Sequence, residues 1–240
     1  MENKFLIADE ISKKYVDKVG YTINLFEQIS LSINESEFVS IVVPTGAGKS
    51  TLLKILADLE SYTSGKLHTN FLRRVFIPSE PSSFPWLNVW QNISFKTELN
   101  EQKIQNIIDD VGLHGYEDHF PDNKSLGFRF RISLGRALAY EADLILFDEP
   151  FNKMDEITRN EIYILVKRIY KKYKVSFLLG TTNIKEAIYF SDKIFVMKKQ
   201  PGKVVDEIYV DILDGEDLTL LNIDEVKKLK YKIEDLLYKR

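Results

Sequence analysis

The sequence of 240 residues has no cysteine, only three histidines and no apolar run long enough to cross a membrane. Without cysteine, a disulfide scaffold, a cysteine-ligated zinc site and a cysteine nucleophile are excluded. A spanning helix needs about 20 mostly apolar residues, and the initial Met-Glu-Asn-Lys lacks the apolar region of a signal peptide. We therefore expect the chain to stay in the cytoplasm and to reach a membrane only through a partner.

The chain also lacks an excess of charge of either sign. It has 33 basic and 36 acidic residues and a formal net charge of −3, whereas a protein that holds nucleic acid by bulk charge is strongly basic. We expect no nucleic-acid partner. Glycine is scarce as well, at 11 residues, so it is informative that Gly46 and Gly48 share one short loop.

Four short apolar segments predict the central strands of a sheet that is covered on both faces. They span residues 38–43, 143–147, 175–179 and 193–197, and they do not alternate with polar residues. Residues 49–60 and 155–173 have helical periodicity. In the second helix the expected N-cap is Asp155, and the expected buried stripe is Ile157, Ile162, Leu165, Val166 and Ile169. Strands that alternate with helices indicate an α/β fold with a mostly parallel core sheet.

Three further parts are predicted around this core. Residues 5–8 and 21–25 suggest strands of an N-terminal antiparallel β subdomain, and residues 84–140 suggest an inserted helical lobe. Residues 223–238 predict an amphipathic helix packed on the body. We expect a single domain over residues 1–240.

A phosphate-binding loop is predicted where the first central strand meets the first helix. The junction consists of Pro44, Thr45, Gly46, Ala47, Gly48, Lys49, Ser50 and Thr51. Its glycines let backbone N–H groups turn toward a phosphate, and the helix N-terminus adds positive charge. Lys49 is expected to reach the β- and γ-phosphates, and the Ser50 hydroxyl to ligate Mg²⁺. The loop departs from G-x-x-x-x-G-K-[ST] because Val43 replaces the first glycine.

An acidic pair ends the second central strand, in Leu144-Ile-Leu-Phe-Asp-Glu-Pro150. We predict that Asp148 helps to hold Mg²⁺ and that Glu149 orients or deprotonates the attacking water. Ligands of open α/β sheets bind at the carboxyl ends of the strands, so these acids are expected beside the phosphate loop. A P-loop NTPase fold is predicted, with ATP and Mg²⁺ as cofactors and with Lys49 and Glu149 as catalytic residues.

Over about residues 3–212 the sequence resembles the ATP-binding subunit of ABC transporters. Residues 133–155 carry the resemblance most clearly, through Arg136-Ala-Leu138, the acidic strand and Phe151-Asn-Lys-Met-Asp155. Phe84-Pro-Trp-Leu-Asn-Val-Trp-Gln-Asn-Ile93 resembles a segment of importers of the nitrate, sulfonate and taurine subfamily. Thr181-Thr-Asn-Ile-Lys-Glu-Ala187 resembles the family's switch segment.

The resemblance implies roles for residues outside these two motifs. Tyr15 falls where an aromatic ring stacks on adenine, although a half-buried strand tyrosine is an open alternative. Asp155 falls at the D-loop aspartate that reaches across a dimer. Ser125 and Gly127 fall in the signature segment, which contacts the ATP held by the opposite subunit.

Four motifs depart from the family pattern. The first is Val43 in the phosphate loop, and the second is Ser79, which stands where the family has the Q-loop glutamine. In the signature segment, Leu126 stands at the first glycine and Phe128 at the glutamine. Thr182 stands at the switch histidine. Losing one placed donor typically costs about 10²–10³ in rate. We expect Mg-ATP binding with attenuated turnover, and full activity is the open alternative.

The resemblance further implies a peripheral subunit at the cytoplasmic side of the cell membrane that energises an ABC-type importer. Its expected partners are transmembrane permease subunits, a second ATP-binding subunit in a homo- or heterodimer and, indirectly, an extracytoplasmic solute-binding protein. Phe84, Trp86 and Trp90 are candidates either for the permease contact or for the lobe core. Two alternatives stay open: an ATP-binding regulatory or structural subunit without significant hydrolysis, and a soluble ABC ATPase of DNA repair or translation.

Overall fold

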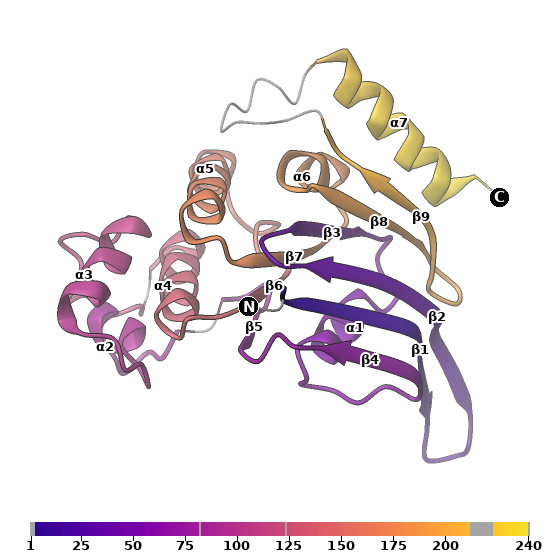
Figure 1. Cartoon of the computed structure of the whole chain (residues 1–240), viewed down its shortest axis with the longest axis horizontal. Helices are drawn as coiled ribbons and strands as arrows, with labels where there is room; N and C mark the ends of the chain where they lie inside the picture. The colour runs from indigo at the N-terminus through magenta and orange to yellow at the C-terminus, as the bar shows by residue number, and fades with distance from the viewer. Residues whose placement is uncertain (1–2, 82, 123, 212–222, 240) are drawn as a thin grey trace.

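The computed structural model describes residues 3–81, 83–122, 124–211 and 223–239. Its central sheet has the strand order β5-β6-β7-β3-β8-β9 (Figure 1). The parallel strands are β5 (Arg74–Ile77), β6 (Leu144–Asp148), β7 (Ser176–Thr181), β3 (Phe38–Val42) and β8 (Lys193–Lys198), and β9 (Lys203–Tyr209) runs antiparallel to β8. The four predicted central strands are confirmed, with ends shifted by one or two residues, whereas β5 and β9 were not predicted.

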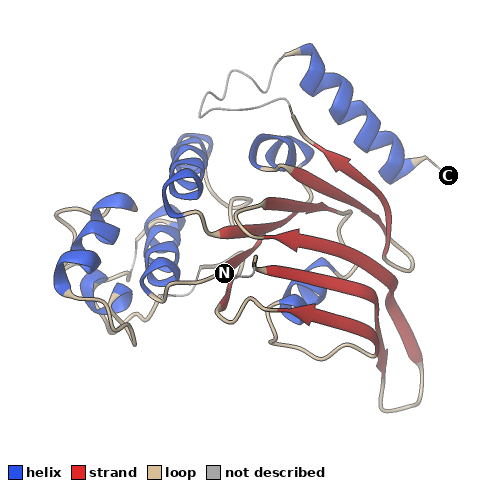
Figure 2. Ribbon diagram, in the orientation of Figure 1, coloured by secondary structure: helices blue, strands red, loops and turns tan. Residues whose placement is uncertain are grey.

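An antiparallel sheet of three strands lies against one face of this centre (Figure 2). It contains β1 (Phe5–Val16), β2 (Thr22–Asn34) and β4 (Ser64–Thr69), and it shares an apolar cluster with α1 (Lys49–Leu56) and the central strands. The predicted N-terminal β subdomain is confirmed, with longer strands than expected. Helix α1 stops short of the predicted residue 60, because Asp58 adopts a left-handed conformation with φ 63° that ends the helix.

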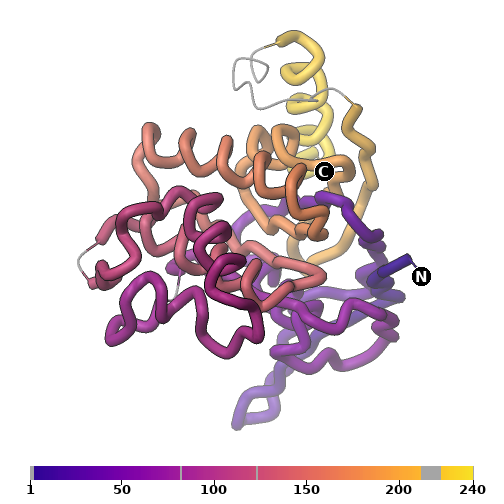
Figure 3. The backbone as a smooth tube through the Cα atoms, turned by 60° about the vertical axis from the view of Figure 1, so that its left-hand side comes forward, coloured from indigo at the N-terminus to yellow at the C-terminus, as the bar shows by residue number. Residues whose placement is uncertain are grey.

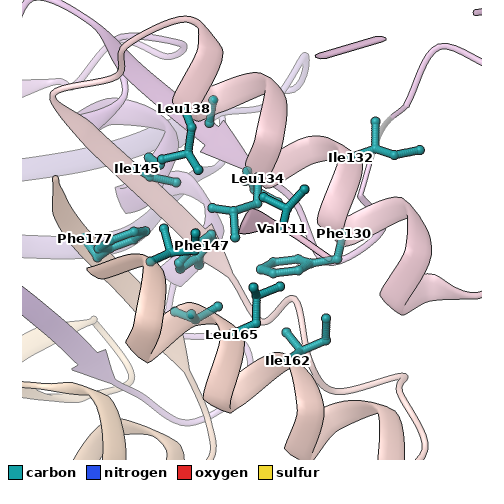
Figure 4. Close-up of a cluster of buried hydrophobic side chains, with 14 of the residues drawn as sticks. Val111, Phe130, Ile132, Leu134, Leu138, Ile145, Phe147, Ile162, Leu165 and Phe177 are labelled. Carbon is teal, nitrogen blue, oxygen red and sulfur yellow. The ribbon is translucent and has the colours of Figure 1, made fainter. Parts of the chain in front are cut away.

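Helices cover the opposite face of the central sheet. Because successive strand residues point to opposite faces, Ile145 and Phe147 of β6 enter the cluster of α4 (Leu126–Ala139) and α5 (Glu156–Tyr173), while Leu144 and Leu146 enter the cluster of α1. Figure 4 shows Phe130 and Leu134 of α4 facing Phe147 and Leu165. This double burial explains why the central strands are apolar throughout.

The expected N-cap of α5 is confirmed, but one residue of its predicted stripe is wrong. Asp155 accepts a hydrogen bond from Thr158 N, and Ile162 and Val166 are fully buried. Ile157 is 75% exposed. Nine residues separate it from Val166, which is two and a half turns at about 3.6 residues per turn, so the two side chains lie on opposite faces of the helix.

Between β5 and β6 the described residues form helices joined by loops, and they form no strand, as predicted. Helices α2 (Val89–Ile93), α3 (Glu101–Asp110) and α4 form a lobe that lies to one side of the sheets (Figure 3). Near the other end of the fold, α6 (Ile184–Phe190), β8 and α7 (Asp224–Tyr238) share a third apolar cluster. The amphipathic helix predicted for residues 223–238 is therefore packed on the body. Among the described residues, no helix has the length and apolar character that crossing a membrane requires.

Candidate nucleotide-binding site

The phosphate loop joins β3 to α1 at the carboxyl end of the central strands. Gly46 and Gly48 have φ of 87° and 89°, a region that glycine enters without steric cost. A Cβ at position 48 would lie 2.7 Å from Leu25 Cγ, so this position excludes a side chain on space as well. No side chain caps the start of α1 among the described residues, and no acid occupies its first turn. The helix N–H groups are left to bind an anion.

A cavity of about 410 Å³ opens over this loop. It is lined by Leu25, Pro44, Thr45, Gly46, Gly48, Lys49, Ser50, Thr51, Ser79, Asp148 and Glu149. The structure thus brings the predicted loop, the acidic pair and the Q-loop position into one site. Ala47 is the loop residue that does not line the cavity, and it is 2% exposed.

Lys49 lies between the two acids in this cavity. Its Nζ donates a hydrogen bond to Asp148 Oδ1 and lies 3.1 Å from Glu149 Oε1. The side chains of Lys49 and Asp148 are each only 11% exposed, so solvent screens their attraction weakly. Asn152 Nδ2 donates to the second Glu149 oxygen. One cation therefore contacts both carboxylates.

Gly180 on β7 provides the space for the Lys49 side chain. It pairs with Asp148 in the sheet, and a Cβ there would lie 2.9 Å from Lys49 Cγ and 2.7 Å from Leu53 Cδ1. Sequence analysis did not single out Gly180, Leu25 or Asn152. For Gly180 a signal was present, since glycine inside an apolar strand often marks a close approach.

Ser50 and Asp148 present the oxygen donors that suit Mg²⁺. Both line the cavity, and hydroxyl and carboxylate oxygens are the hard ligands this ion prefers. The residues present therefore fit the predicted ion, and Ser50 and Asp148 would hold it.

The side chain of Val43 lies in the apolar core and not in the cavity. Val43 is 1% exposed and belongs to the cluster of α1 and the N-terminal sheet. Its N–H donates to Thr181 O at 3.2 Å, so the residue extends the pairing of β3 with β7. The missing first glycine thus leaves the lined cavity unobstructed.

We expect Val43→Gly to destabilise the protein by about 2–4 kcal/mol without tightening ATP binding. The loss combines a buried valine side chain, about 1.5–3 kcal/mol, with the greater flexibility of glycine in the unfolded chain. Chemical denaturation and equilibrium titration with Mg-ATP measure the two effects. Val16→Gly is the matched control because Val16 ends β1 and is 67% exposed. Tighter ATP binding by Val43→Gly would contradict this account.

Tyr15 is not among the residues that line the cavity. It lies opposite Ile23 in the β1–β2 pair and is 41% exposed. Its hydroxyl donates to Glu60, and Lys13 Nζ lies 4.8 Å from the centre of its ring. The predicted adenine contact stays a prediction.

The residues predicted to form the signature segment lie at the start of α4. Ser125 is the N-cap, and its hydroxyl accepts a hydrogen bond from Phe128 N at 3.2 Å. Gly127 is buried, and a Cβ there would lie 2.5 Å from Thr158 Cγ2 of α5, so glycine is required here by helix packing. Leu126 packs partly buried against the lobe core. The contact of Ser125 and Gly127 with a partner's ATP involves a second chain and stays a prediction.

Asp155 and Thr182 also lie outside the cavity lining. The Asp155 carboxylate accepts hydrogen bonds from the Thr158 hydroxyl at 2.6 Å and from Thr158 N at 2.9 Å. These bonds hold the pKa of Asp155 below its usual range. Thr182 follows directly after β7 and is partly exposed. Their roles at a dimer interface stay predictions.

The geometry defines a class of protein. A glycine loop follows a buried parallel strand and opens a helix, and an acidic pair ends a second strand that β7 separates from the first. This arrangement belongs to the P-loop nucleoside triphosphatases, in which backbone N–H groups and a lysine bind the phosphates.

Comparison with known proteins identifies the family. The family model for ABC transporters matches residues 26–152. The aliphatic sulfonates import ATP-binding protein SsuB of Bacillus subtilis (strain 168) is 35% identical over 82% of each chain. SsuB 1 of Pseudomonas savastanoi pv. phaseolicola (strain 1448A / Race 6) is 34% identical over 84% of this chain and 86% of its own. The chain belongs to the ABC transporter family, and it is an ATPase cassette of that family.

Solved structures share the fold. CbiO1 of Clostridium perfringens, part of the cbiONQ transporter complex, aligns over 98% of both chains with a TM-score of 0.76 at 19% identity. A dimeric ATP-binding cassette in a post-hydrolysis state with ADP and Pi aligns over 85% of this chain and 98% of its own, with a TM-score of 0.72 at 24% identity. These neighbours support the mixed α/β fold with an antiparallel N-terminal sheet and a mostly parallel core sheet.

Proposed function

We propose that this chain is the ATP-hydrolysing subunit of an ABC-type importer and binds peripherally at the cytoplasmic side of the cell membrane. The observation that carries the proposal is the cluster of Lys49, Asp148 and Glu149 in the cavity over the phosphate loop. The names of the relatives, which are import ATP-binding proteins, support the importer assignment.

In the proposed mechanism, the phosphates of ATP displace the acids as partners of Lys49. The loop N–H groups and the lysine then bind the β- and γ-phosphates and stabilise the charge of the transferring phosphoryl group. Glu149, released from Lys49, accepts a proton from the attacking water, while Asn152 keeps its carboxylate oriented. Mg²⁺, held by Ser50 and Asp148, would neutralise part of the phosphate charge.

Turnover is expected to be attenuated. Ser79 lines the cavity, but its side chain is shorter than that of glutamine. Thr182 replaces a histidine, and a threonine hydroxyl carries no positive charge toward a γ-phosphate. Since losing one placed donor typically costs about 10²–10³ in rate, both substitutions support slow hydrolysis.

The permease subunits are proposed to bind at the outer aromatic residues of the lobe. Trp86 is 70% exposed and Phe95 is 40% exposed. Phe84 lies between them, with ring centres 5.6 Å from Trp86 and 4.8 Å from Phe95. Trp90 packs against the lobe core instead. Exposed aromatic residues of this kind often anchor protein interfaces.

A second ATP-binding subunit completes the proposed assembly, and an extracytoplasmic solute-binding protein acts through the permease. In a mixed pair, the phosphate loop of this chain would face the partner's signature segment, and Ser125 would face the partner's phosphate loop. The altered signature of this chain, with Leu126 at a glycine position, favours a partner that is less altered.

The test is Mg-ATP binding and steady-state turnover of the purified chain, measured alone and with membranes from the cells that produce it. Binding with slow turnover that rises when the chain associates with the membrane complex is the expected result. An ordinary turnover rate in a homodimer would contradict the mixed pair. Absence of ATP binding would contradict the whole proposal.

The alternative is an ATP-binding regulatory subunit without significant hydrolysis, which the substitutions Ser79 and Thr182 favour. It predicts binding without turnover even in the assembled membrane complex. The intact Glu149, bonded to Asn152 beside Lys49, favours hydrolysis instead.

A further inference from the structure

Helix α6 carries a buried carboxylate, that of Glu186. Glu186 is 1% exposed, and both its oxygens accept hydrogen bonds from hydroxyl groups. Thr181 Oγ1 donates to Oε2 at 2.6 Å, and Tyr163 OH donates to Oε1 at 2.5 Å. Burial raises the pKa of this carboxyl, and the two hydroxyl groups act in the opposite direction. A carboxylate is costly to bury unless it is hydrogen-bonded, so its two hydroxyl partners must stay within hydrogen-bonding distance.

The hydroxyl of Thr181 links the two residues that flank Thr182. Thr181 Oγ1 donates to Glu186 and also accepts a hydrogen bond from Asn183 N at 2.9 Å. The two neighbours of Thr182 are therefore tied together by one oxygen atom. Asn183 is in turn the N-cap of α6, where its side chain accepts from Lys185 N. The backbone of Thr182 is thereby held at the carboxyl end of β7.

Thr181 is also linked to the phosphate loop, and Glu186 is linked to α5. Thr181 pairs with Val42 of β3, and its carbonyl accepts from Val43 N at 3.2 Å. Tyr163 belongs to α5, the helix that Asp155 caps. Its ring centre lies 5.2 Å from that of Phe151, two residues beyond Glu149. The Glu186 carboxylate thus connects the elements that carry Thr182, Asp155 and Glu149.

We propose that Glu186 is a positioning residue for ATP hydrolysis: through Thr181 and Tyr163 it fixes the switch residue Thr182 relative to β7 and α5. A glutamine would keep the size of this side chain, but its amide offers one acceptor oxygen in place of two, so one of the two hydroxyl groups would lose its acceptor. Because Glu186 does not line the nucleotide cavity, it acts on the transition-state geometry and not on the binding of ATP. The inference rests on the ATPase activity of this site.

The experiment compares Glu186→Gln and Tyr163→Phe with a matched control, Tyr170→Phe. Tyr170 lies on the same helix, and its hydroxyl also donates to a carboxylate, Asp192, at 2.6 Å. We expect the first two variants to lower kcat about 10–100-fold with unchanged KM and Kd for Mg-ATP, since misplacement by about 1 Å costs up to about 10²-fold. The control is expected to keep kcat even where its thermal stability falls.

A second readout separates positioning from a general loss of structure. Thr182→His is expected to raise kcat in the parent chain and to lose most of that gain when combined with Glu186→Gln. An equal gain in both backgrounds would overturn the proposal. So would a kcat loss in Tyr170→Phe that matches the loss in Tyr163→Phe.

A measurement that does not depend on catalysis distinguishes failure of the positioning role of Glu186 from failure of the proposed ATPase function. If the parent chain binds ATP but shows no turnover, hydrolysis fails as a function, and deuterium exchange over residues 176–190 decides the positioning role. We then expect exchange at the Thr182–Asn183 amides to rise at least about tenfold in Glu186→Gln and Tyr163→Phe but not in Tyr170→Phe. Unchanged exchange in all three variants would overturn the proposal.

Discussion

Replacing Glu149 with glutamine is expected to lower ATP turnover by about 10²–10⁴-fold while ATP affinity stays nearly unchanged. The amide keeps the size of the side chain but cannot accept the proton of the attacking water, and general-base catalysis contributes about this factor. The lysine and the loop, which bind the phosphates, are retained. Steady-state phosphate release and equilibrium titration with Mg-ATP give the two quantities.

The matched control for this change is Glu156→Gln. Glu156 is exposed in the first turn of α5, seven positions from Glu149, so the same change in charge occurs outside the cavity. Its turnover should equal that of the parent chain. Equal turnover of Glu149→Gln and the parent chain would reject Glu149 as the base, and absence of turnover in both would favour the regulatory alternative.

Replacing Lys49 with alanine is expected to weaken Mg-ATP binding about 10²-fold and to abolish measurable turnover. Removing one partner of a close charge pair costs about 2–5 kcal/mol, and a tenfold change in affinity corresponds to about 1.4 kcal/mol. The change also leaves Asp148 and Glu149 without the cation that lies between them. The negative charges of the two carboxylates then repel an entering phosphate. Isothermal titration measures the affinity.

Lys54→Ala is the control on the same helix, because Lys54 is exposed in the last turn of α1. Lys49→Arg keeps the positive charge, and it provides a second test of the phosphate site in case the alanine variant does not fold. The broad, planar guanidinium must fit beside Gly180. The lysine side chain already passes so close to this glycine that an added Cβ would lie 2.9 Å from Lys49 Cγ. We expect this variant to fold and to bind ATP more weakly than the parent chain. Full affinity of both Lys49 variants would contradict the proposed phosphate site.

The sequence alone was sufficient for the features that depend on contiguous residues. A strand, a glycine turn and a helix start follow one another between residues 38 and 56, and steric limits on the backbone make that junction recognisable locally. The central strands were predictable because a strand buried on both faces is apolar at every position. Local periodicity was less reliable in α5, where Ile157 turned out to face solvent.

The tertiary structure decided everything that depends on which segments lie side by side. That Val43 points into the core, that Gly180 leaves room for Lys49 and that Glu186 receives two hydroxyl groups all follow from pairings between distant strands and helices. Side-chain direction and free space at such positions are set by the register of β3, β6 and β7 and by the packing of α5 and α6 on them. A linear sequence determines the chemical groups of the site through its motifs, whereas their distances arise only when the sheet brings the strands together.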